Sequence, residues 1–379
     1  MADYTSKKNH EAGFSLVELV FSMAVMVVVM SGVMSVMMDV SVAKDTVSLT
    51  TTTNQNLRVA MDLIIRDLLQ TGQGLPAGRV VGIPSGAGAT PVRRPGPLDP
   101  ANSPNTIVYQ FDPALVALPA LTSGPALGPD VNLAPTDMVT AIGADSAFEG
   151  VQLSALNATD MTVVPTLNIS DNPDVARDNL QVGDLIMLTK QSMSTLKYVS
   201  RIVNNTVYFD VNDPMNLNQT GVGVIGTLAH YVSLVPETAA CELPPPNPCG
   251  QMVVPSVATR IRMVTYYIDP TPMETGFRLM RRINARPPTV VAFSIDSLLL
   301  TYDLIDDVGN PTDVALDTSD IAGTGACAPL ACSSNQIRKV NVHLMGRSSQ
   351  RHPKTRQFLR NTLNTQVSLR SLALVDRYS

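Results

Sequence analysis

The stretch Gly13-Phe14-Ser15-Leu16-Val17-Glu18 sets the architecture of the first part of this chain. It opens an apolar run from Phe14 to Met38 in which Glu18 is the only charged residue. A helix over this run is about 37 Å long, which exceeds a hydrocarbon core of about 30 Å. A carboxylate inside a membrane span costs about 2.5–3.5 kcal/mol on insertion scales. We therefore expect one membrane-spanning helix in which Glu18 serves a function.

The residues before the apolar run are polar, and they include Lys7 and Lys8. An ordinary secretory signal places its apolar segment before the cleavage site. Here the apolar segment follows Gly13, so cleavage after Gly13 leaves the membrane anchor on the product. Because positive charges stay on the cytoplasmic side, the two lysines predict that the residues after Met38 face the periplasm.

The basic leader, the glycine, the aromatic residue after it and the glutamate four residues later resemble the prepilin signature of type IV pilins. The resemblance implies that a prepilin peptidase cleaves between Gly13 and Phe14 and that Phe14 is N-methylated. It also implies that the protonated amine of Phe14 pairs with Glu18 of a neighbouring subunit, because an unpaired buried charge costs several kcal/mol. The alternative is an ordinary single-pass anchor with an incidental glutamate. Unlike many major pilins, the chain has no proline within the span, and Gly32 is its one weak point.

The helix is predicted to continue into water as far as about Gln70. Leu57, Met61, Ile64 and Leu68 recur at four- and three-residue steps, and this spacing predicts one buried helix face. The opposite face is predicted to be solvated and to carry the charged residues Arg58, Asp62, Arg66 and Asp67. Gly72, Gly74 and Pro76 are predicted to end the helix.

The rest of the chain predicts short strands and long loops. Loops rich in Pro and Gly are expected over 77–105 and 112–137. Alternating or apolar segments predict strands over 105–111, 160–165, 182–189, 196–202, 207–211, 227–234, 260–268, 276–283, 289–302, 336–345 and 365–375. The expected fold class is α+β, with a long N-terminal helix packed on an antiparallel β-rich periplasmic domain. The expected divisions are a leader (1–13), a membrane or filament-core helix (14–38), its amphipathic continuation (39–72) and the β-rich domain (73–379).

Several downstream segments together resemble the PilW-like minor pilins, which are related to the J-type pseudopilins of type II secretion. These segments are LRVAMDLIIRDLLQTGQG (57–74), VGDLIMLT (182–189), TYYID with FRLMRRI (265–283), VVAFSIDSLLLTYDL (290–304), IRKVNVHLMGRSS (337–349) and QFLRNTLNTQVSLRSLAL (357–374). The resemblance implies a minor pilin that helps to prime pilus assembly and lies at or near the tip. It also implies other minor pilins, the major pilin and a PilY-type tip adhesin as partners.

Two alternatives stay open at this point. The first is a pseudopilin of a type II secretion system. The second is a membrane-anchored periplasmic binding or adhesion protein. In the favoured interpretation the protein is first held in the inner membrane and later becomes part of an extracellular pilus.

The four cysteines form two close pairs, Cys241 with Cys249 and Cys327 with Cys332. In an oxidising periplasm each pair predicts a small loop-closing disulfide. A zinc site would need all four thiolates to converge, and neither pair has the CxxC spacing of common zinc sites.

Two charged segments are weaker candidates for binding. Asp306, Asp307, Asn310 and Asp313 could supply oxygens to calcium, but they lack the order of an EF-hand, so a solvated turn is favoured. No other metal or cofactor is expected. Arg347, Arg351, His352, Lys354, Arg356 and Arg360 form a basic stretch between the last two predicted strands. We interpret it as a solvated loop, with DNA, lipid headgroups and an acidic neighbour as alternatives.

Other chemistry is not indicated. The formal charge of −5 and the aromatic content of 4% do not favour nucleic-acid binding. The GxGxxG match at 221–226 lacks the strand that a dinucleotide site needs before it, and a hairpin turn is favoured. The four histidines are scattered, and no GxSxG, HExxH or P-loop motif is present. We therefore do not expect an enzyme.

Overall fold

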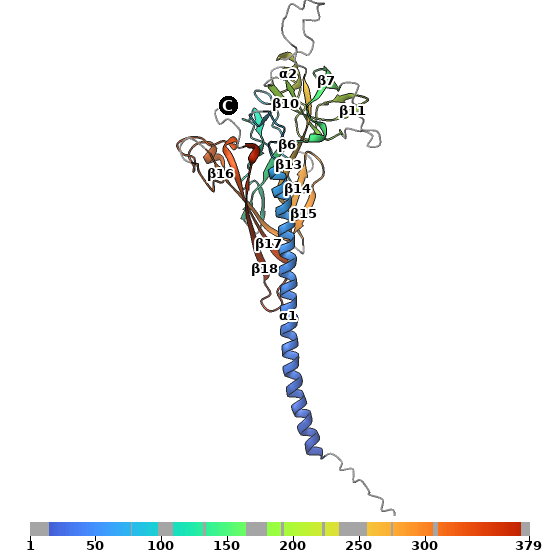
Figure 1. Cartoon of the computed structure of the whole chain (residues 1–379), viewed down its shortest axis with the longest axis vertical. Helices are drawn as coiled ribbons and strands as arrows, with labels where there is room; N and C mark the ends of the chain where they lie inside the picture. Colours follow the sequence, from blue (N-terminus) through green and yellow to red (C-terminus); the bar gives the residue numbers. More distant parts are fainter. Residues whose placement is uncertain are drawn as a thin grey trace, which may run out of the picture.

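The computed structural model describes residues 15–76, 78–97, 109–131, 134–163, 180–190, 193–221, 224–234, 256–273, 276–305 and 310–372. Within these residues, one long helix carries a β-rich domain at its C-terminal end (Figure 1). The N-terminal half of the helix extends away from the domain as a shaft. The predicted α+β architecture is therefore confirmed.

The helix α1 spans Leu16–Leu69 without interruption. It begins after Ser15, whose extended backbone and small polar side chain suit an N-cap. It ends where Gly72 and Gly74 adopt positive φ angles of 78° and 65°, a conformation that glycine accepts readily. The predicted end of the helix near Gln70 is therefore confirmed.

The larger of the two main sheets is built around β13 (Val257–Met273), and all its strand pairs are antiparallel. Within the described residues, its other strands are β3 (Leu121–Thr122), β6 (Val139–Ala144), β7 (Val151–Leu156), β8 (Asp160–Val163), β9 (Leu185–Lys190), β10 (Met193–Tyr198), β11 (Arg201–Val203), β12 (Thr206–Tyr208), β14 (Gly276–Ile283) and β15 (Thr289–Phe293). The length of β13 lets it pair with β9 and β7 near its start, with β6 farther along and with β14 near its end.

The second sheet has the order β16 (Ile295–Leu304), β17 (Ile337–Arg351) and β18 (Phe358–Ser368). Sequence predicted one strand over 289–302, but Ser294 adopts a positive φ of 60° and divides it into β15 and β16. Because these two strands belong to different sheets, the turn at Ser294 connects the sheets. The C-terminal half of α1 contacts β15 of the larger sheet and β17 and β18 of the second.

The remaining elements are short. They are β1 (Val80–Gly82), β2 (Ala117–Pro119), β4 (Gly128–Val131), β5 (Ala134–Thr136), α2 (Leu228–Leu234), α3 (Thr318–Ile321) and the 3-10 turns Ser146–Phe148, Ser334–Gln336 and Arg370–Leu372. β1 pairs with β2, and β4 pairs with β5. Within its described residues, the region predicted as a loop over 112–137 therefore contains the four short strands β2, β3, β4 and β5.

Within the described residues, two large hydrophobic cores and a small cluster of Met138, Tyr267 and Met280 support this arrangement. The main core lies under α1 and includes Leu57, Ile64 and Leu68 of the helix together with residues of both sheets. A second core lies in the lobe formed by β7 to β12 and α2, and it includes Phe148 and Tyr231.

Two further sequence predictions were wrong in their secondary structure. The segment 227–234 was predicted as a strand, but it forms α2, and the Thr227 hydroxyl accepts a hydrogen bond from the backbone N–H of His230 at 3.2 Å. A short apolar run cannot be assigned to helix or strand by periodicity alone. The basic stretch was predicted to be a loop between strands, but β17 continues to Arg351 and β18 begins at Phe358. The reason is that Arg347 and Arg360 lie opposite each other across the ladder and both contact Asp296.

The predicted strand over 105–111 lies mostly outside the described residues. Its described end, Tyr109 to Phe111, forms only an isolated bridge between Gln110 and Arg93.

Candidate functional site

Glu18 lies in the first turn of α1, close to the point where the helix begins. Its Oε2 accepts a hydrogen bond from the backbone N–H of Ser15 at 3.2 Å, and both residues are exposed. In a single copy the carboxylate is therefore held by its own chain and remains accessible to a positively charged partner. Gly13 and Phe14, the predicted cleavage-site residues, lie outside the described residues.

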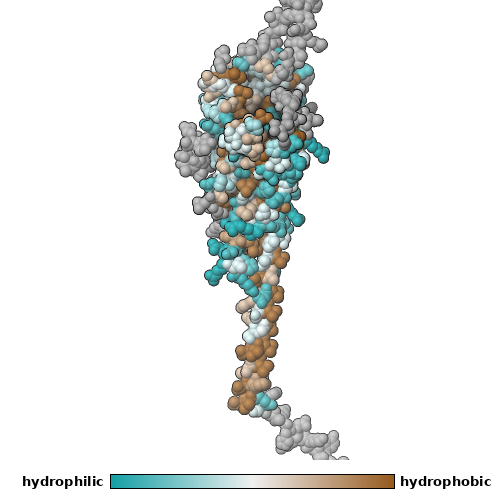
Figure 2. All heavy atoms as spheres, turned by 90° about the vertical axis from the view of Figure 1, so that its left-hand side faces the viewer, coloured by the Kyte–Doolittle hydropathy of each residue, from teal (hydrophilic) through white to brown (hydrophobic). Residues whose placement is uncertain are grey.

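The N-terminal half of α1 is not covered by the domain, and within the described residues its one polar contact with it is the exposed ion pair between Asp39 and Lys354. Every residue from Ser15 to Ser41 is exposed, and its large apolar side chains are between 47% exposed at Val25 and 79% exposed at Leu16. Figure 2 shows this segment as a brown shaft below the domain. Soluble monomers rarely expose an apolar patch of more than a few hundred Å². The shaft therefore requires a lipid or protein environment.

The backbone and the small polar side chains of this shaft suit a membrane. α1 is long enough and apolar enough to cross a bilayer, and within the described residues no second helix meets these conditions. The hydroxyls of Ser22 and Ser31 donate to the carbonyls of Leu19 and Val28 at 2.9 and 2.7 Å. Because these hydroxyls are hydrogen-bonded within the helix, they do not need water as a partner. This suits a lipid environment, which offers none.

The C-terminal half of α1 is covered by the domain. Val42, Thr46 and Leu49 are half-buried, and Thr53 is buried on the same face. Farther along, the apolar face is fully buried at Leu57, Ala60, Met61, Ile64 and Leu68. The predicted apolar face is therefore confirmed.

Asp67 was predicted to face solvent, and this prediction was wrong. Its side chain is 1% exposed, and its two oxygens accept from Arg262 Nη2 at 2.7 Å, Arg281 Nε at 2.6 Å and the Tyr266 hydroxyl at 2.6 Å. Burial, followed by the Asp67 carboxylate, raises the pKa of Tyr266 well above its usual range, so that its hydroxyl stays a donor. Asp67 thus joins the last turn of α1 to β13 and β14.

Sequence reasoning missed this contact because its partners are far away in the chain. Asp67 lies beside Leu68 on the border of the apolar face, where a local pattern cannot distinguish a solvated carboxylate from a buried one. Only the arginine-rich segments RIRM (260–263) and RLMRRI (278–283) offered a signal, since buried carboxylates need such partners.

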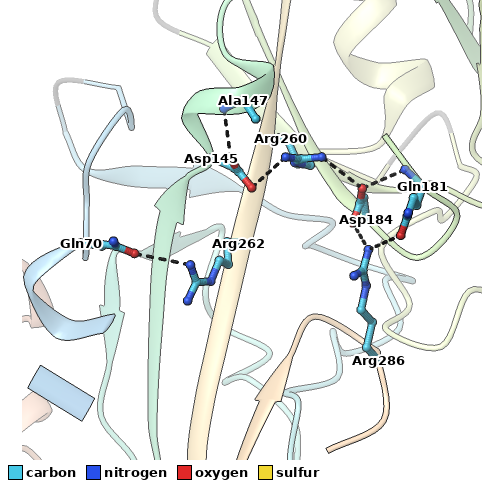
Figure 3. A network of polar contacts seen from close by, with 8 residues as sticks. All are labelled: Gln70, Asp145, Ala147, Gln181, Asp184, Arg260, Arg262 and Arg286. Carbon is cyan, nitrogen blue, oxygen red and sulfur yellow. Dashed lines mark hydrogen bonds and ion pairs between the residues drawn. The ribbon is translucent and has the colours of Figure 1, made fainter. Parts of the chain in front are cut away.

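A second group of ion pairs continues from this point into the lobe of the second core (Figure 3). Arg260 lies between two carboxylates, with Nη2 at 2.9 Å from Asp145 Oδ2 and Nη1 at 3.8 Å from Asp184 Oδ2. Arg286 Nη2 lies 2.6 Å from Asp184 Oδ1. Burial raises the pKa of Asp184, although the Gln181 N–H and the two guanidinium groups act in the opposite direction. Figure 3 shows these side chains converging from β13, from the turn before β9 and from the turn after β14.

These ion pairs line a groove of about 460 Å³. Its lining includes five arginines together with Asp145 and Asp184. Asp145 and Asp184 are already engaged by Arg260 and Arg286, so neither is an isolated general base. We interpret the arrangement as a structural clamp between α1, β13 and the lobe.

Lys197 is a buried amine that the sequence did not single out. Its side chain lies in β10, and Nζ donates to the carbonyls of Leu217 and Gly226, both at 3.1 Å. Burial lowers the pKa of Lys197 to about 7, and Asp213 acts in the opposite direction. We therefore expect the stability of the domain to depend on pH.

The calcium candidates are divided by the limits of the described residues. Asp306 and Asp307 lie outside them, whereas Asn310 and Asp313 lie within. Asp313 Oδ1 accepts from Thr301 and Asn341, both at 3.0 Å. In the described part of the chain, no group of three or more His, Cys, Asp or Glu residues is placed to hold a metal ion.

The remaining candidates do not join these sites. Cys327 and Cys332 form the predicted disulfide, with their Cα atoms 5.7 Å apart. Cys241 and Cys249 lie outside the described residues. The described part of the GxGxxG match precedes the seven-residue helix α2, and Ile225 pairs with Ser85 in an isolated bridge. The GxGxxG match was predicted to be a hairpin turn. Within the described residues, no strand leads directly into it, and a helix instead of a strand follows it.

Comparison with known proteins supports the interpretation of the N-terminus. The prokaryotic N-terminal methylation motif matches residues 8–34, which include Gly13, Phe14 and Glu18. Neither the curated proteins nor the solved structures contain a match to the chain. The motif, together with the exposed apolar shaft of α1, supports a membrane-anchored protein of the type IV pilin or pseudopilin kind.

Proposed function

We propose that this protein is a minor pilin that helps to prime type IV pilus assembly and lies at or near the pilus tip. The observation that carries the proposal is the position of Glu18, the one carboxylate in the exposed and otherwise apolar stretch of α1 from Leu16 to Met38. In this proposal a prepilin peptidase cleaves between Gly13 and Phe14, and Phe14 is methylated on its new amine. Its partners are the major pilin, other minor pilins and a PilY-type tip adhesin.

The chemistry of assembly follows from the exposure of Glu18. In the single copy, Glu18 accepts one hydrogen bond from Ser15 N–H and has no charged partner among the described residues. Inside a filament or membrane, water no longer solvates this carboxylate. A positively charged amine of a neighbouring Phe14 would then offset the cost of burying it and fix the position of one subunit against the next.

The tip location is supported by the size and shape of the domain. The segment from residue 73 onward makes up most of the chain, and α1 contacts strands of both main sheets. A domain of this size is easier to place at the end of a filament than within a regular stack of subunits.

Substitutions of Glu18 test the proposal. Glu18→Val removes both the charge and the hydrogen bond to Ser15, whereas Glu18→Gln keeps an acceptor for Ser15 and removes only the charge. If the charge drives assembly, both variants should fail to restore piliation in a deletion strain while remaining in the membrane. Asp45→Ala, which removes an exposed carboxylate outside the apolar run, serves as the control and should restore piliation.

The methylation motif fits pilus assembly and type II secretion equally. The deletion strain distinguishes the two systems, because each predicts the loss of a different process. A deletion that abolishes pili and leaves protein secretion intact agrees with the proposal. Loss of secretion with normal pili would instead assign the protein to a type II secretion system. Pili restored by Glu18→Val would contradict the role proposed for Glu18.

A further inference from the structure

The end of the second sheet forms a two-stranded ribbon that points toward the membrane half of α1. The last pairing with β16 joins Ile295 to Gly346. Beyond this point β17 and β18 pair only with each other, at Arg347 with Arg360 and at Arg351 with Phe358. Figure 1 shows the turn of this hairpin as the lowest part of the domain beside α1.

The ribbon runs along α1, as two contacts show. Near its base the side chains of Asn361 and Asn54 form a hydrogen bond. At its turn Lys354 Nζ lies 2.7 Å from Asp39 Oδ1. The helix rises about 22 Å between Asn54 and Asp39, and extended chain from Asn361 to Lys354 covers about 23 Å. The ribbon is therefore parallel to the helix, and its turn lies at the level of Asp39.

The level of Asp39 is the boundary of the apolar shaft. Asp39 is the first charged residue after Glu18, and the residues between them are exposed. The stretch 16–38 is about 34 Å long as a helix, close to the thickness of a hydrocarbon core of about 30 Å. When this stretch spans a bilayer, the hairpin turn lies at the depth of the headgroups.

The turn presents positive charge at this depth. Arg351, Lys354 and Arg356 are all exposed, and within the described residues Lys354 alone among them forms an ion pair, with Asp39. Both partners of this pair are 62% exposed, so it is weak and leaves Lys354 able to contact other groups. Lys44 and Asp45 follow Asp39 on the helix. With them, this region has four cations and only two carboxylates, Asp39 and Asp45. Figure 2 shows hydrophilic side chains along the lower edge of the domain, directly above the shaft.

The cations are held on a structured turn. His352 Nδ1 accepts from the backbone N–H of Lys354 at 3.3 Å and of Thr355 at 3.2 Å. The guanidinium of Arg351 lies over the ring of Phe358, 5.2 Å from its centroid. A positively charged turn with fixed geometry at headgroup depth complements a layer of phosphate groups.

We infer that the β17–β18 turn binds anionic phospholipid headgroups on the side of the membrane where the domain lies, through Arg351, Lys354 and Arg356. This contact would hold the domain against the bilayer until α1 leaves the membrane. This inference rests on the membrane insertion of α1 in the proposed function, and it does not depend on whether the protein builds a pilus or a pseudopilus.

The test uses the full chain carrying Thr355→Trp, reconstituted in lipid nanodiscs. The chain has no tryptophan, so the introduced one reports only on the exposed turn. Discs of phosphatidylcholine alone are compared with discs containing phosphatidylglycerol, each with the same fraction of a lipid whose headgroup quenches tryptophan. We expect about twofold stronger quenching in the anionic discs at low salt, and loss of this difference at about 0.5 M salt.

Variants in the same background separate lipid binding from simple proximity. Lys354→Gln with Arg356→Gln should remove the difference between the two disc types. Arg201→Gln with Lys339→Gln also removes two exposed positive charges, but from β11 and from the far end of β17, and should preserve it. Asp39→Asn should preserve or strengthen quenching in anionic discs, because it frees Lys354 for the headgroups.

Three results would overturn the inference. Equal quenching in both disc types would mean that the turn lies near the surface without binding anionic headgroups. If the protein is inserted but tryptophan is not quenched in either disc type, the turn does not reach the headgroups. An acidic protein surface would then be the partner of the turn. Failure of the chain to enter discs, measured by co-elution with lipid, would refute the membrane insertion of α1 as well, and so distinguishes failure of the proposed function from failure of this inference alone.

Discussion

The two halves of α1 belong to one continuous helix but have opposite surroundings. From Leu16 to Met38 the helix is bare, and its large apolar side chains are all exposed. From Val42 onward one face is progressively covered, and Ile64 is completely buried. The bare half has apolar residues all round, whereas the covered half has an apolar stripe with polar residues opposite. The pattern of hydrophobicity therefore distinguishes a helix segment that packs against lipid or other subunits from one that packs against its own domain.

The largest effect on stability is expected at Asp67, where the covered half is fixed to the sheet. Asp67→Ala leaves Arg281, Arg262 and the Tyr266 hydroxyl without their acceptor, and should lower the free energy of unfolding by about 3–5 kcal/mol. Chemical denaturation of the full chain in detergent measures this change. Asp62→Ala, at an exposed position on the same helix, should change it by less than about 0.5 kcal/mol. Equal effects of the two substitutions would contradict the clamp assigned to Asp67.

A pair of apolar truncations compares the halves directly. Ile64→Ala should destabilise the domain by about 2–5 kcal/mol, because the side chain is completely buried. Val28→Ala removes an apolar side chain that is 70% exposed, and should leave the unfolding of the domain unchanged in detergent. If Val28→Ala destabilised the domain as much as Ile64→Ala, the bare half would have to contact the domain after all.

A smaller effect on the free energy of unfolding is expected from pH. It arises from Lys197, which lies in the domain and not in the bare half of α1. The pKa of Lys197 is about 7 in the folded protein and about 10.4 in an unfolded chain. Between these values the unfolded chain binds a proton that the folded chain lacks, so the free energy of unfolding should rise with pH. From pH 7 to pH 9 the expected rise is about 2 kcal/mol. Lys197→Met should abolish it, whereas Lys339→Met, at a lysine that is 45% exposed, should preserve it.

The sequence was sufficient for the features that depend on local patterns. The apolar run with Glu18 predicted the shaft, and the spacing of Leu57, Met61, Ile64 and Leu68 predicted the covered face. The Cys327–Cys332 disulfide also followed from residues that are close in the sequence.

The features that were missed depend on residues distant in the chain. Asp67 is buried because Arg262, Tyr266 and Arg281 come from strands some two hundred residues later. The basic stretch continues β17 and β18 because Asp296 and α1 lie beside it. The break at Ser294, which separates two sheets, has no distinctive local signal, since a positive φ at serine is uncommon.

The most direct test of the central claim is the N-terminal sequence and mass of the protein isolated from membranes. If the bare half of α1 is the assembly helix of a type IV pilin-like subunit, the mature chain begins at Phe14 and carries a methyl group on its amine. In a strain without the prepilin peptidase, the same protein should retain residues 1–13. A mature chain that keeps its leader in the presence of the peptidase, or that begins at another residue, would contradict the account.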